Sequence, residues 1–223
     1  AACETLASAA RLPTGPCHHR IPAALVVVFD IGNVLVRWNP RNLFRKTFKD
    51  EARMEQFLGA ALAMDFIALT DIVADFSHAI AERARAFPEF ARELHLFDER
   101  WVETIGGPIE ENVALMRRLK AAGRPVYALS NFASVKFAIA RQMYDFLSEF
   151  DICVVSGHVG VVKPDPRIYK ILFERAGRRP EDLVFVDDSL RNVEAARALG
   201  MAAIHYNPGV DLERELEAHG ALD

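Results

Sequence analysis

The sequence has little cysteine. Its three cysteines, Cys3, Cys17 and Cys153, are too few and too irregularly spaced for a disulfide framework, and no two of them form a Cys-x-x-Cys metal motif. The tract Cys17-His18-His19 has no partner ligands at a usable spacing, so we do not expect a metal site there. This cysteine usage excludes a small disulfide-stabilised scaffold and favours a reduced, cytoplasmic setting.

Long hydrophobic runs and an excess of one charge are also missing. No apolar stretch approaches the roughly 18 residues of a membrane span, and residues 1–20 lack the charged start and long apolar centre of a secretory signal. A formal net charge of -4 gives no basic surface for nucleic acid or an anionic membrane. We expect a cytoplasmic monomer or homodimer that binds neither, with residues 1–20 as a loosely ordered extension.

From residue 25 onward the 223-residue sequence alternates short apolar segments with amphipathic ones. This alternation is typical of an α/β protein in which helices cover both faces of a parallel sheet. The pattern predicts strands at 25–30, 125–130, 151–155, 183–187 and 202–206. It predicts helices at 108–123, 166–177, 189–199 and 211–220, which begin near a proline or a capping residue and end at or next to a glycine.

Residues 40–107 interrupt this alternation. They contain no convincing strand, and their apolar residues recur at helical spacing, as at Phe44, Phe48, Phe57, Leu58, Leu62, Phe66 and Ile72. An insert that leaves the carboxyl end of the first strand lies above the place where open α/β sheets bind ligands. We therefore predict a helical cap at 40–107 and a Rossmann-like core formed by 21–39 and 108–223. The candidates for cap residues that meet the substrate are Asp65, Asp71, His78 and Trp101.

Polar side chains follow four of the apolar segments. Asp30 follows 25–29, Ser130-Asn131 follows 126–129, Lys163 follows 154–162, and Asp187-Asp188 follows 183–186. Because the carboxyl ends of parallel strands meet at one edge of a sheet, these groups can assemble one acidic site that carries a cation. Two adjacent aspartates repel each other unless a cation or donors neutralise them, and Mg²⁺ favours one or two carboxylates with a backbone carbonyl and phosphate oxygens.

In this order the four groups resemble the four motifs of the haloacid dehalogenase superfamily, from about Leu25 to about Tyr206. The Asp-x-Gly-Asn form of the first motif is most similar to a phosphatase branch with a small helical C1-type cap, which includes glucose-1-phosphatase-like proteins. The resemblance implies a Rossmann-like sheet of order 3-2-1-4-5 with the cap inserted after the first strand. The matching segments are Phe29-Asp30-Ile31-Gly32-Asn33-Val34-Leu35-Val36, Leu129-Ser130-Asn131, Val162-Lys163-Pro164-Asp165-Pro166, and Phe185-Val186-Asp187-Asp188-Ser189 with Asn192.

The resemblance also implies a nucleophile and a metal site. Asp30 takes the phosphoryl group from a small phosphorylated metabolite as an aspartyl phosphate. Mg²⁺ is held by the Asp30 carboxylate, the Gly32 carbonyl and the Asp188 carboxylate. Asp187 lies close by and acts through a water molecule.

Four further residues are implied to bind phosphate or to orient the groups that do. Lys163 stabilises the nucleophile and the transferring phosphate by its charge. Ser130 and the Asn131 N–H grip phosphate oxygens. Asn192 orients Lys163 or a water on the metal.

Gly32 departs from the family pattern. Most phosphatases of this superfamily have an aspartate at this position, which protonates the leaving group and then activates water, whereas a glycine supplies no proton. General acid-base catalysis is typically worth about 10²- to 10⁴-fold. The substrate class that we favour is a sugar 1-phosphate, because its acidic leaving oxygen needs less protonation. A cap residue that lends the proton is the other explanation, with Asp65, Asp71 and His78 as the options.

Two other functions stay open. A metal-independent 2-haloacid dehalogenase shares Ser130-Asn131 and Lys163 with this chain. Dehalogenases of the superfamily, however, typically have tyrosine in place of Gly32 and Ser-x-Asn in place of Asp187-Asp188. A non-catalytic phosphate-binding or interaction module would explain the missing acid at position 32.

Overall fold

A five-stranded parallel sheet forms the core of the structure, a computed structural model that describes residues 25–222. Its strands lie in the order β5-β4-β1-β6-β7, and every neighbouring pair is parallel. Counted along the chain this order is 3-2-1-4-5, so the predicted Rossmann-like sheet is confirmed. The five predicted strands agree with the observed ones to within one residue at each end, and these are β1 (Val26–Phe29), β4 (Val126–Ser130), β5 (Ile152–Val155), β6 (Leu183–Asp187) and β7 (Ala202–His205).

Two predictions concern the amino-terminal residues. The loosely ordered extension at 1–20 and the Cys17-His18-His19 tract lie outside the described residues. Within residues 25–222, no helix is both long and apolar enough to cross a membrane.

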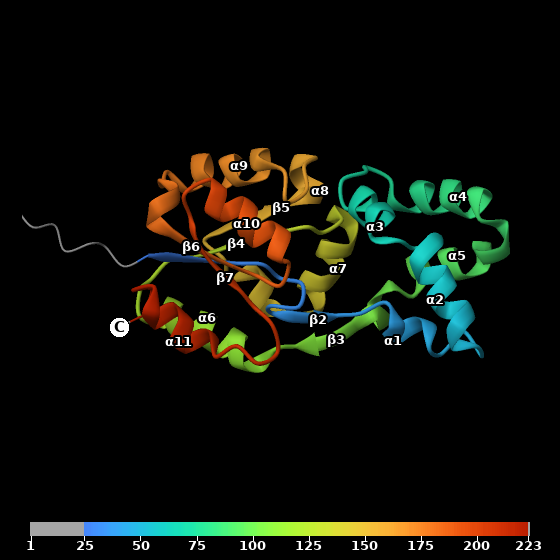
Figure 1. Cartoon of the computed structure of the whole chain (residues 1–223), viewed down its shortest axis with the longest axis horizontal. Helices are drawn as coiled ribbons and strands as arrows, with labels where there is room; N and C mark the ends of the chain where they lie inside the picture. The colour runs from blue at the N-terminus through green and yellow to red at the C-terminus, as the bar shows by residue number, and fades with distance from the viewer. Residues whose placement is uncertain (1–24, 223) are drawn as a thin grey trace, which may run out of the picture.

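Helices cover both faces of the sheet because successive strand residues point in opposite directions. In β1, Val27 and Phe29 belong to one buried cluster, and Val26 and Val28 belong to another. Figure 1 shows α9 and α10 above the sheet and α6 and α11 below it. The helices of the core are α6 (Glu110–Ala121), α7 (Ser134–Met143), the one-turn α8 (Ser156–Val159), α9 (Pro166–Ala176), α10 (Leu190–Ala198) and α11 (Leu212–Ala218). Four of them match the predicted helices, and α7 and α8 are additional.

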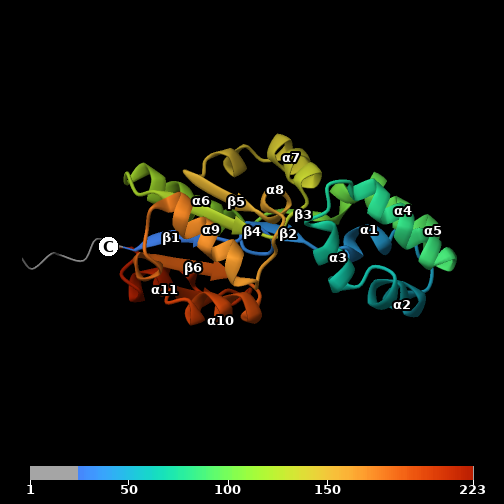
Figure 2. The same cartoon turned by 90° about the horizontal axis from the view of Figure 1, so that it is seen from above.

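Residues 41–104, here called the helical insert, stand beyond one end of the sheet (Figures 1 and 2). The segment is helical, as its apolar spacing predicts. Its centre is aromatic: the rings of Phe44 and Phe57 lie 4.6 Å apart, edge to face, and the ring of Phe90 lies 5.4 Å from that of Phe57. Its elements are α1 (Arg41–Phe44), α2 (Glu51–Ala60), α3 (Met64–Thr70), α4 (Phe76–Ala86) and α5 (Ala91–Glu99), with short 3₁₀ helices at Pro88–Phe90 and Trp101–Thr104.

Two short strands connect the helical insert to the core, and the prediction that 40–107 contains no strand is wrong at its end. β2 (Val36–Trp38) pairs in antiparallel fashion with β3 (Ile105–Pro108). A Cβ added at Gly106 would lie 3.0 Å from the Cβ of Arg37, so the glycine permits the close approach of the two strands. Glycines and a proline in β3 are typical of a turn, and only the distant partner strand makes this segment extended.

A partly buried ion pair also joins the helical insert to the core. Lys136 Nζ on α7 lies 2.6 Å from Asp98 Oδ1 on α5 and donates to the Asp98 carbonyl at 2.9 Å. The ring of Trp101 packs edge to face against Phe132 at 5.6 Å. These contacts hold the helical insert against α7 in this structure.

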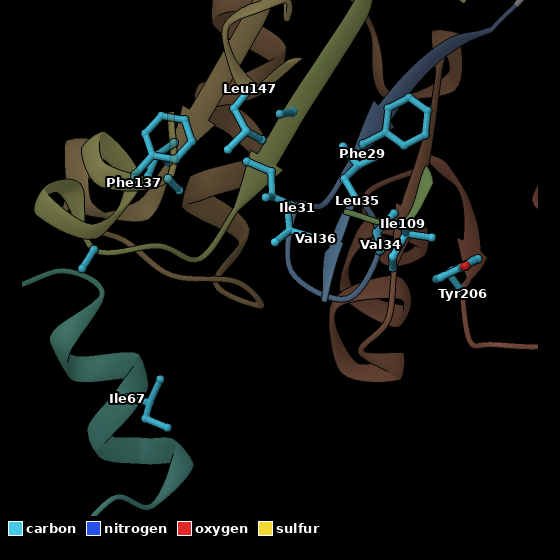
Figure 3. Close-up of a cluster of buried hydrophobic side chains, with 14 of the residues drawn as sticks. Phe29, Ile31, Val34, Leu35, Val36, Ile67, Ile109, Phe137, Leu147 and Tyr206 are labelled. Atoms are coloured by element: carbon cyan, nitrogen blue, oxygen red, sulfur yellow. The ribbon is translucent and has the colours of Figure 1, made fainter. Parts of the chain in front are cut away.

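The turn after β1 is fixed by apolar side chains on both sides of Asp30. Ile31, Val34 and Leu35 have no exposed surface, and Figure 3 shows them in one cluster with Phe29. The Val36 N–H donates to the Ile31 carbonyl at 2.9 Å, which closes the turn. The backbone that carries Asp30 is therefore held by packing as well as by hydrogen bonds.

Candidate active site

Three polar side chains meet at one edge of the sheet because their strands are neighbours. Asp30 directly follows β1, Ser130 ends β4 and Asp187 ends β6, and β1 lies between the other two strands. Phe29 is opposite Val186 in the register, so the next residues, Asp30 and Asp187, come level. The parallel sheet thus assembles groups that are far apart in the sequence.

Lys163 places a buried cation between the two carboxylates. Its Nζ lies 2.9 Å from Asp30 Oδ1 and 2.6 Å from Asp187 Oδ2, and it donates to the Leu129 carbonyl at 2.9 Å. Burial opposes its charge, but Asp187 and Asp30 together raise the pKa of Lys163 above its ordinary value. The lysine follows α8 and a turn, not a strand as the apolar stretch 154–162 suggests.

Asp187 is engaged in holding Lys163. It is fully buried, and Asn192 Nδ2 donates to both of its oxygens, at 3.0 and 3.1 Å. The Ser189 N–H adds a third donor at 2.7 Å. Asn192 therefore contacts Asp187 rather than Lys163, and it orients the lysine only through this carboxylate.

Asp30 is a buried carboxylate in a partly acidic environment. Burial raises the pKa of Asp30 from 3.8 to about 7; Lys163 lowers it, and the charges of Asp187 and Asp188 raise it. The Ile31 N–H donates to Asp30 Oδ1 at 2.7 Å and orients the carboxylate. A further cation at this place would stabilise the charged form.

Asn33 links Asp188 to the turn after β1. Its Nδ2 donates to Asp188 Oδ2 at 3.1 Å, and its Oδ1 accepts the Trp38 N–H at 3.0 Å. Its φ of 52° lies in the left-handed region, which asparagine adopts more readily than most residues. The motif resemblance predicts no separate role for Asn33, although a Gly-Asn pair after a buried strand is a signal of such a turn.

Ser130 offers a buried hydroxyl beside Asp30. Its Oγ lies close enough to Asp30 to favour the charged carboxylate, but it makes no well-formed hydrogen bond within residues 25–222. A buried polar atom without a partner marks a place where a ligand oxygen fits. The Asn131 side chain has a role that the motifs do not predict: it donates to the Lys163 carbonyl at 3.1 Å and accepts the Lys163 N–H at 2.8 Å.

The donor set fits Mg²⁺. One oxygen from each of Asp30, Asp187 and Asp188 lies within 4.8 Å of the others. Because Asp187 is saturated by donors, Asp30 and Asp188 are the better ligands. Among residues 25–222, no hydrogen bond uses the Gly32 carbonyl oxygen, which leaves it for a hard cation. Burial and the charge of Asp187 raise the pKa of Asp188, although Asn33 and Lys163 act in the opposite direction. A bound cation would favour the charged form of Asp188 too.

Asn33→Ala is expected to weaken Mg²⁺ binding about 10- to 100-fold, because alanine removes the donor that orients Asp188. Isothermal titration with MgCl₂ measures this effect. Asn33→Gly is the matched control, since it lacks the amide but tolerates the φ of 52°. Both variants should lose the same affinity, and alanine should lower the stability by about 1–2 kcal/mol more than glycine does. Unchanged Mg²⁺ affinity in both variants would contradict a role for the amide.

Position 32 has open space where the family resemblance leads us to expect an acidic side chain. A Cβ added at Gly32 would meet no atom within 4 Å. The turn after β1 therefore accommodates a side chain here, but none of its own groups supplies the proton transfer expected of that acid.

Of the four insert residues predicted to meet substrate, only Asp71 lies at the edge that carries these groups. Asp65 is exposed, the His78 side chain is 66% exposed, and Trp101 is buried in packing. The Asp71 carbonyl accepts a hydrogen bond from Ser156 Oγ of the core at 3.1 Å. The Asp71 carboxyl lies close enough to Asp30 and Lys163 for its pKa to respond to their charges.

A groove of about 650 Å³ opens beside Asp188. Asn33, Arg37 and residues 206–213 line it together with Asp188. The groove therefore adjoins the Asp188 side of the site.

Residues 25–200 match the haloacid dehalogenase-like hydrolases. The match covers well over half of the chain, so this protein belongs to the haloacid dehalogenase-like hydrolase family. The resemblance found in the motifs is confirmed at this level, and the chain is a hydrolase.

Among the curated relatives, a sesquiterpene phosphatase from Aspergillus oryzae is 28% identical over 195 residues, which are 85% of this chain and 93% of that protein. A drimenol cyclase from Aspergillus calidoustus is 36% identical over 91 residues. That match covers 41% of this chain but only 17% of the cyclase, so the similarity concerns one part of a longer protein.

Solved structures share the fold. A haloacid dehalogenase family enzyme from Bacteroides thetaiotaomicron, in complex with magnesium and inorganic phosphate, is 21% identical, with a TM-score of 0.63 over 86% of this chain and 99% of its own. An L-2-haloacid dehalogenase is 18% identical, with a TM-score of 0.59 over 88% of this chain and 100% of its own. At these identities the similarity shows the fold alone.

Proposed function

We propose that this chain is a Mg²⁺-dependent phosphohydrolase that cleaves a small phosphate ester through an aspartyl phosphate at Asp30. The observation that carries the proposal is the buried Lys163 ammonium, which bridges Asp30 and Asp187. It lies beside the Ser130 hydroxyl, which has no hydrogen-bond partner among residues 25–222. A nucleophilic carboxylate, a fixed cation and a hydroxyl donor are what phosphoryl transfer to an aspartate requires. The similarity to a sesquiterpene phosphatase supports a phosphate ester as substrate.

Each residue of the site has its own role in the first chemical step. Asp30 attacks phosphorus, a bond forms from its oxygen, and the bond from phosphorus to the ester oxygen breaks. Lys163 and the Ser130 hydroxyl bind the non-bridging phosphate oxygens, where negative charge must be stabilised. Asp187 keeps Lys163 in place through the 2.6 Å ion pair, so the ammonium does not have to move during the reaction.

The second step returns Asp30 to its free form. Water attacks the phosphorus of the aspartyl phosphate, and the bond from phosphorus to Asp30 breaks. Mg²⁺, when held by Asp30, Asp188 and the Gly32 carbonyl, supplies positive charge that offsets the repulsion between phosphate and carboxylates. Magnesium and phosphate in the Bacteroides thetaiotaomicron enzyme support this choice of ion.

The helical insert acts as the cap of this enzyme. In this division of the chain, residues 21–39 and 108–223 form the core and residues 40–107 form the cap. Its docking on α7 through Lys136 and Asp98 supports this role. A closed cap keeps bulk water away from the phosphoryl group and strengthens the electrostatic interactions there.

Hydrolysis of p-nitrophenyl phosphate with and without Mg²⁺ tests the proposed reaction. We expect phosphate release with MgCl₂ and its loss in EDTA. Halide release from a 2-haloacid without added Mg²⁺ would instead identify a dehalogenase, which Asp187-Asp188 disfavours. Binding of beryllium fluoride without any turnover would identify a non-catalytic module.

We expect glucose 1-phosphate to be hydrolysed about tenfold faster in kcat/KM than glucose 6-phosphate, a difference of about 1.4 kcal/mol in barrier. The anomeric oxygen is the more acidic leaving group, so its departure depends less on protonation by any acid, and Gly32 supplies none. Phosphate release from both esters under the same conditions measures the ratio. Equal or reversed rates would remove the leaving-group argument for a sugar 1-phosphate.

A further inference from the structure

With glycine at position 32, no side chain there can protonate the leaving oxygen or remove a proton from the attacking water. An acidic leaving oxygen removes the need for the first of these two proton transfers only. The hydrolysis of the aspartyl phosphate is the same for every substrate, because the leaving group has already departed. The attacking water must then lose a proton to a base. If the proposed function holds, some residue other than position 32 has to supply that base.

Asp71 is tied by hydrogen bonds to the loop that binds phosphate. It follows α3 of the helical insert, and its carbonyl accepts from Ser156 Oγ at 3.1 Å. The same hydroxyl accepts the Phe132 N–H at 2.8 Å, and Phe132 directly follows Ser130-Asn131. Ser156 is fully buried, so this link is shielded from water. Figures 1 and 2 both show α3 on the side of the helical insert that faces the core.

The Asp71 carboxyl lies within electrostatic reach of the reacting groups. Burial is the main reason that the pKa of Asp71 is raised to about 7, and the charge of Asp30 acts in the same direction. The Ala133 N–H and the charge of Lys163 oppose this rise. A carboxyl with a pKa near neutrality can both give and accept a proton at physiological pH. The space at Gly32, where an added Cβ would meet no atom within 4 Å, leaves room beside Asp30 for water or a leaving group.

We propose that Asp71 is the general acid and base of this site, supplied by the helical insert in place of an acid at position 32. In the first step the Asp71 carboxyl gives its proton to the ester oxygen as the bond to phosphorus breaks, and the alcohol leaves. In the second step the Asp71 carboxylate takes a proton from water, whose oxygen attacks phosphorus while the bond to Asp30 breaks. Inorganic phosphate leaves, and Asp71 is protonated for the next turnover.

Rapid-quench kinetics of Asp71→Asn with p-nitrophenyl phosphate and Mg²⁺ tests this role. Because p-nitrophenolate leaves without a proton, the variant should keep a burst of p-nitrophenolate stoichiometric with the enzyme and accumulate the aspartyl phosphate. Its steady-state turnover should fall about 10²- to 10⁴-fold, because the second step has lost its base. Asp65→Asn, an exposed aspartate at the start of the same helix, is the matched control and should behave like the unmodified protein.

Adding Gly32→Asp to Asp71→Asn separates catalysis from structure. If Asp71 supplies the proton transfer, the new acid should restore steady-state turnover by about tenfold or more. Turnover of Asp71→Asn within about threefold of the unmodified protein would overturn the inference, because the loss of a base costs far more. A joint loss of burst and turnover that Gly32→Asp does not restore would also overturn it, because Asp71 would then only hold the loop. Absence of burst and turnover in the unmodified protein would count against the proposed function itself.

Discussion

Asp30→Asn is expected to lower the rate of phosphate ester hydrolysis on the order of 10⁴-fold or more, because the amide cannot form the aspartyl phosphate. The substitution keeps the shape of the side chain, and Lys163 keeps its partner Asp187 at 2.6 Å. Acid-quenched protein incubated with substrate should therefore show the mass of a phosphoryl adduct only when Asp30 is intact. An adduct on Asp30→Asn would place the nucleophile elsewhere.

The same variant should be no less stable than the unmodified protein, which separates a catalytic loss from a folding defect. Burial raises the pKa of Asp30 from 3.8 to about 7, so the folded state binds the proton more tightly than the unfolded state does. The stability contributed by this group is present below pH 3.8 and is lost as the pH rises through about 7. In EDTA, the stability of Asp30→Asn relative to the unmodified protein should accordingly rise from pH 5 to pH 8, as followed by thermal unfolding at several pH values. A relative stability that falls with pH would contradict the burial of a charged Asp30.

Lys163→Met is expected to be the most destabilising of the proposed substitutions, by about 3–5 kcal/mol, because it leaves the buried carboxylates of Asp30 and Asp187 without their cation. The methionine has a similar length but cannot replace the contacts at 2.9 and 2.6 Å. Activity should also fall by at least about 10²- to 10³-fold, since a preorganised charge at the phosphate is lost. Urea unfolding in EDTA measures the stability, and phosphate release measures the activity.

An exposed lysine on α9 provides the control for this substitution. Lys170→Met should change the stability by no more than about 0.5 kcal/mol, as is usual for surface positions. Adding Asp30→Asn to Lys163→Met should recover part of the lost stability, because one of the two buried charges is then removed. Equal unfolding midpoints for Lys163→Met and Lys170→Met would contradict the buried ion pairs.

Much of the site could be predicted from the sequence because parallel sheets place the ends of their strands together. An apolar run of about five residues followed by a polar residue is typical of a strand end, and Asp30, Ser130 and Asp187 each follow or close such a run. The structure brings these residues together with Lys163 and Asp188, as the motif order implies. Local signals of this kind need no knowledge of distant contacts.

Other features depend on contacts between segments that are far apart. β3 is strand-like only because β2 pairs with it, and its Gly106-Gly107 sequence is typical of a turn. Asn192 could have faced Lys163 or a water, and its position on α10 directs it to Asp187. The roles of Asn33 and of the Asn131 side chain likewise depend on which groups the folded chain places opposite their amides.

Three features can be predicted from the sequence alone: the alternation of strands and helices, the strand ends that carry Asp30 and its partners, and the glycine where an acid is expected at position 32. These features depend on runs of apolar residues and on short motifs, each of which involves only a few neighbouring residues. Which residue of the helical insert lies beside these groups depends instead on contacts between distant segments. Asp65, Asp71 and His78 are alike as candidates in the sequence, but the packing of the helical insert on the core ties Asp71 alone, among these three, to Ser156 and leaves the other two exposed to solvent.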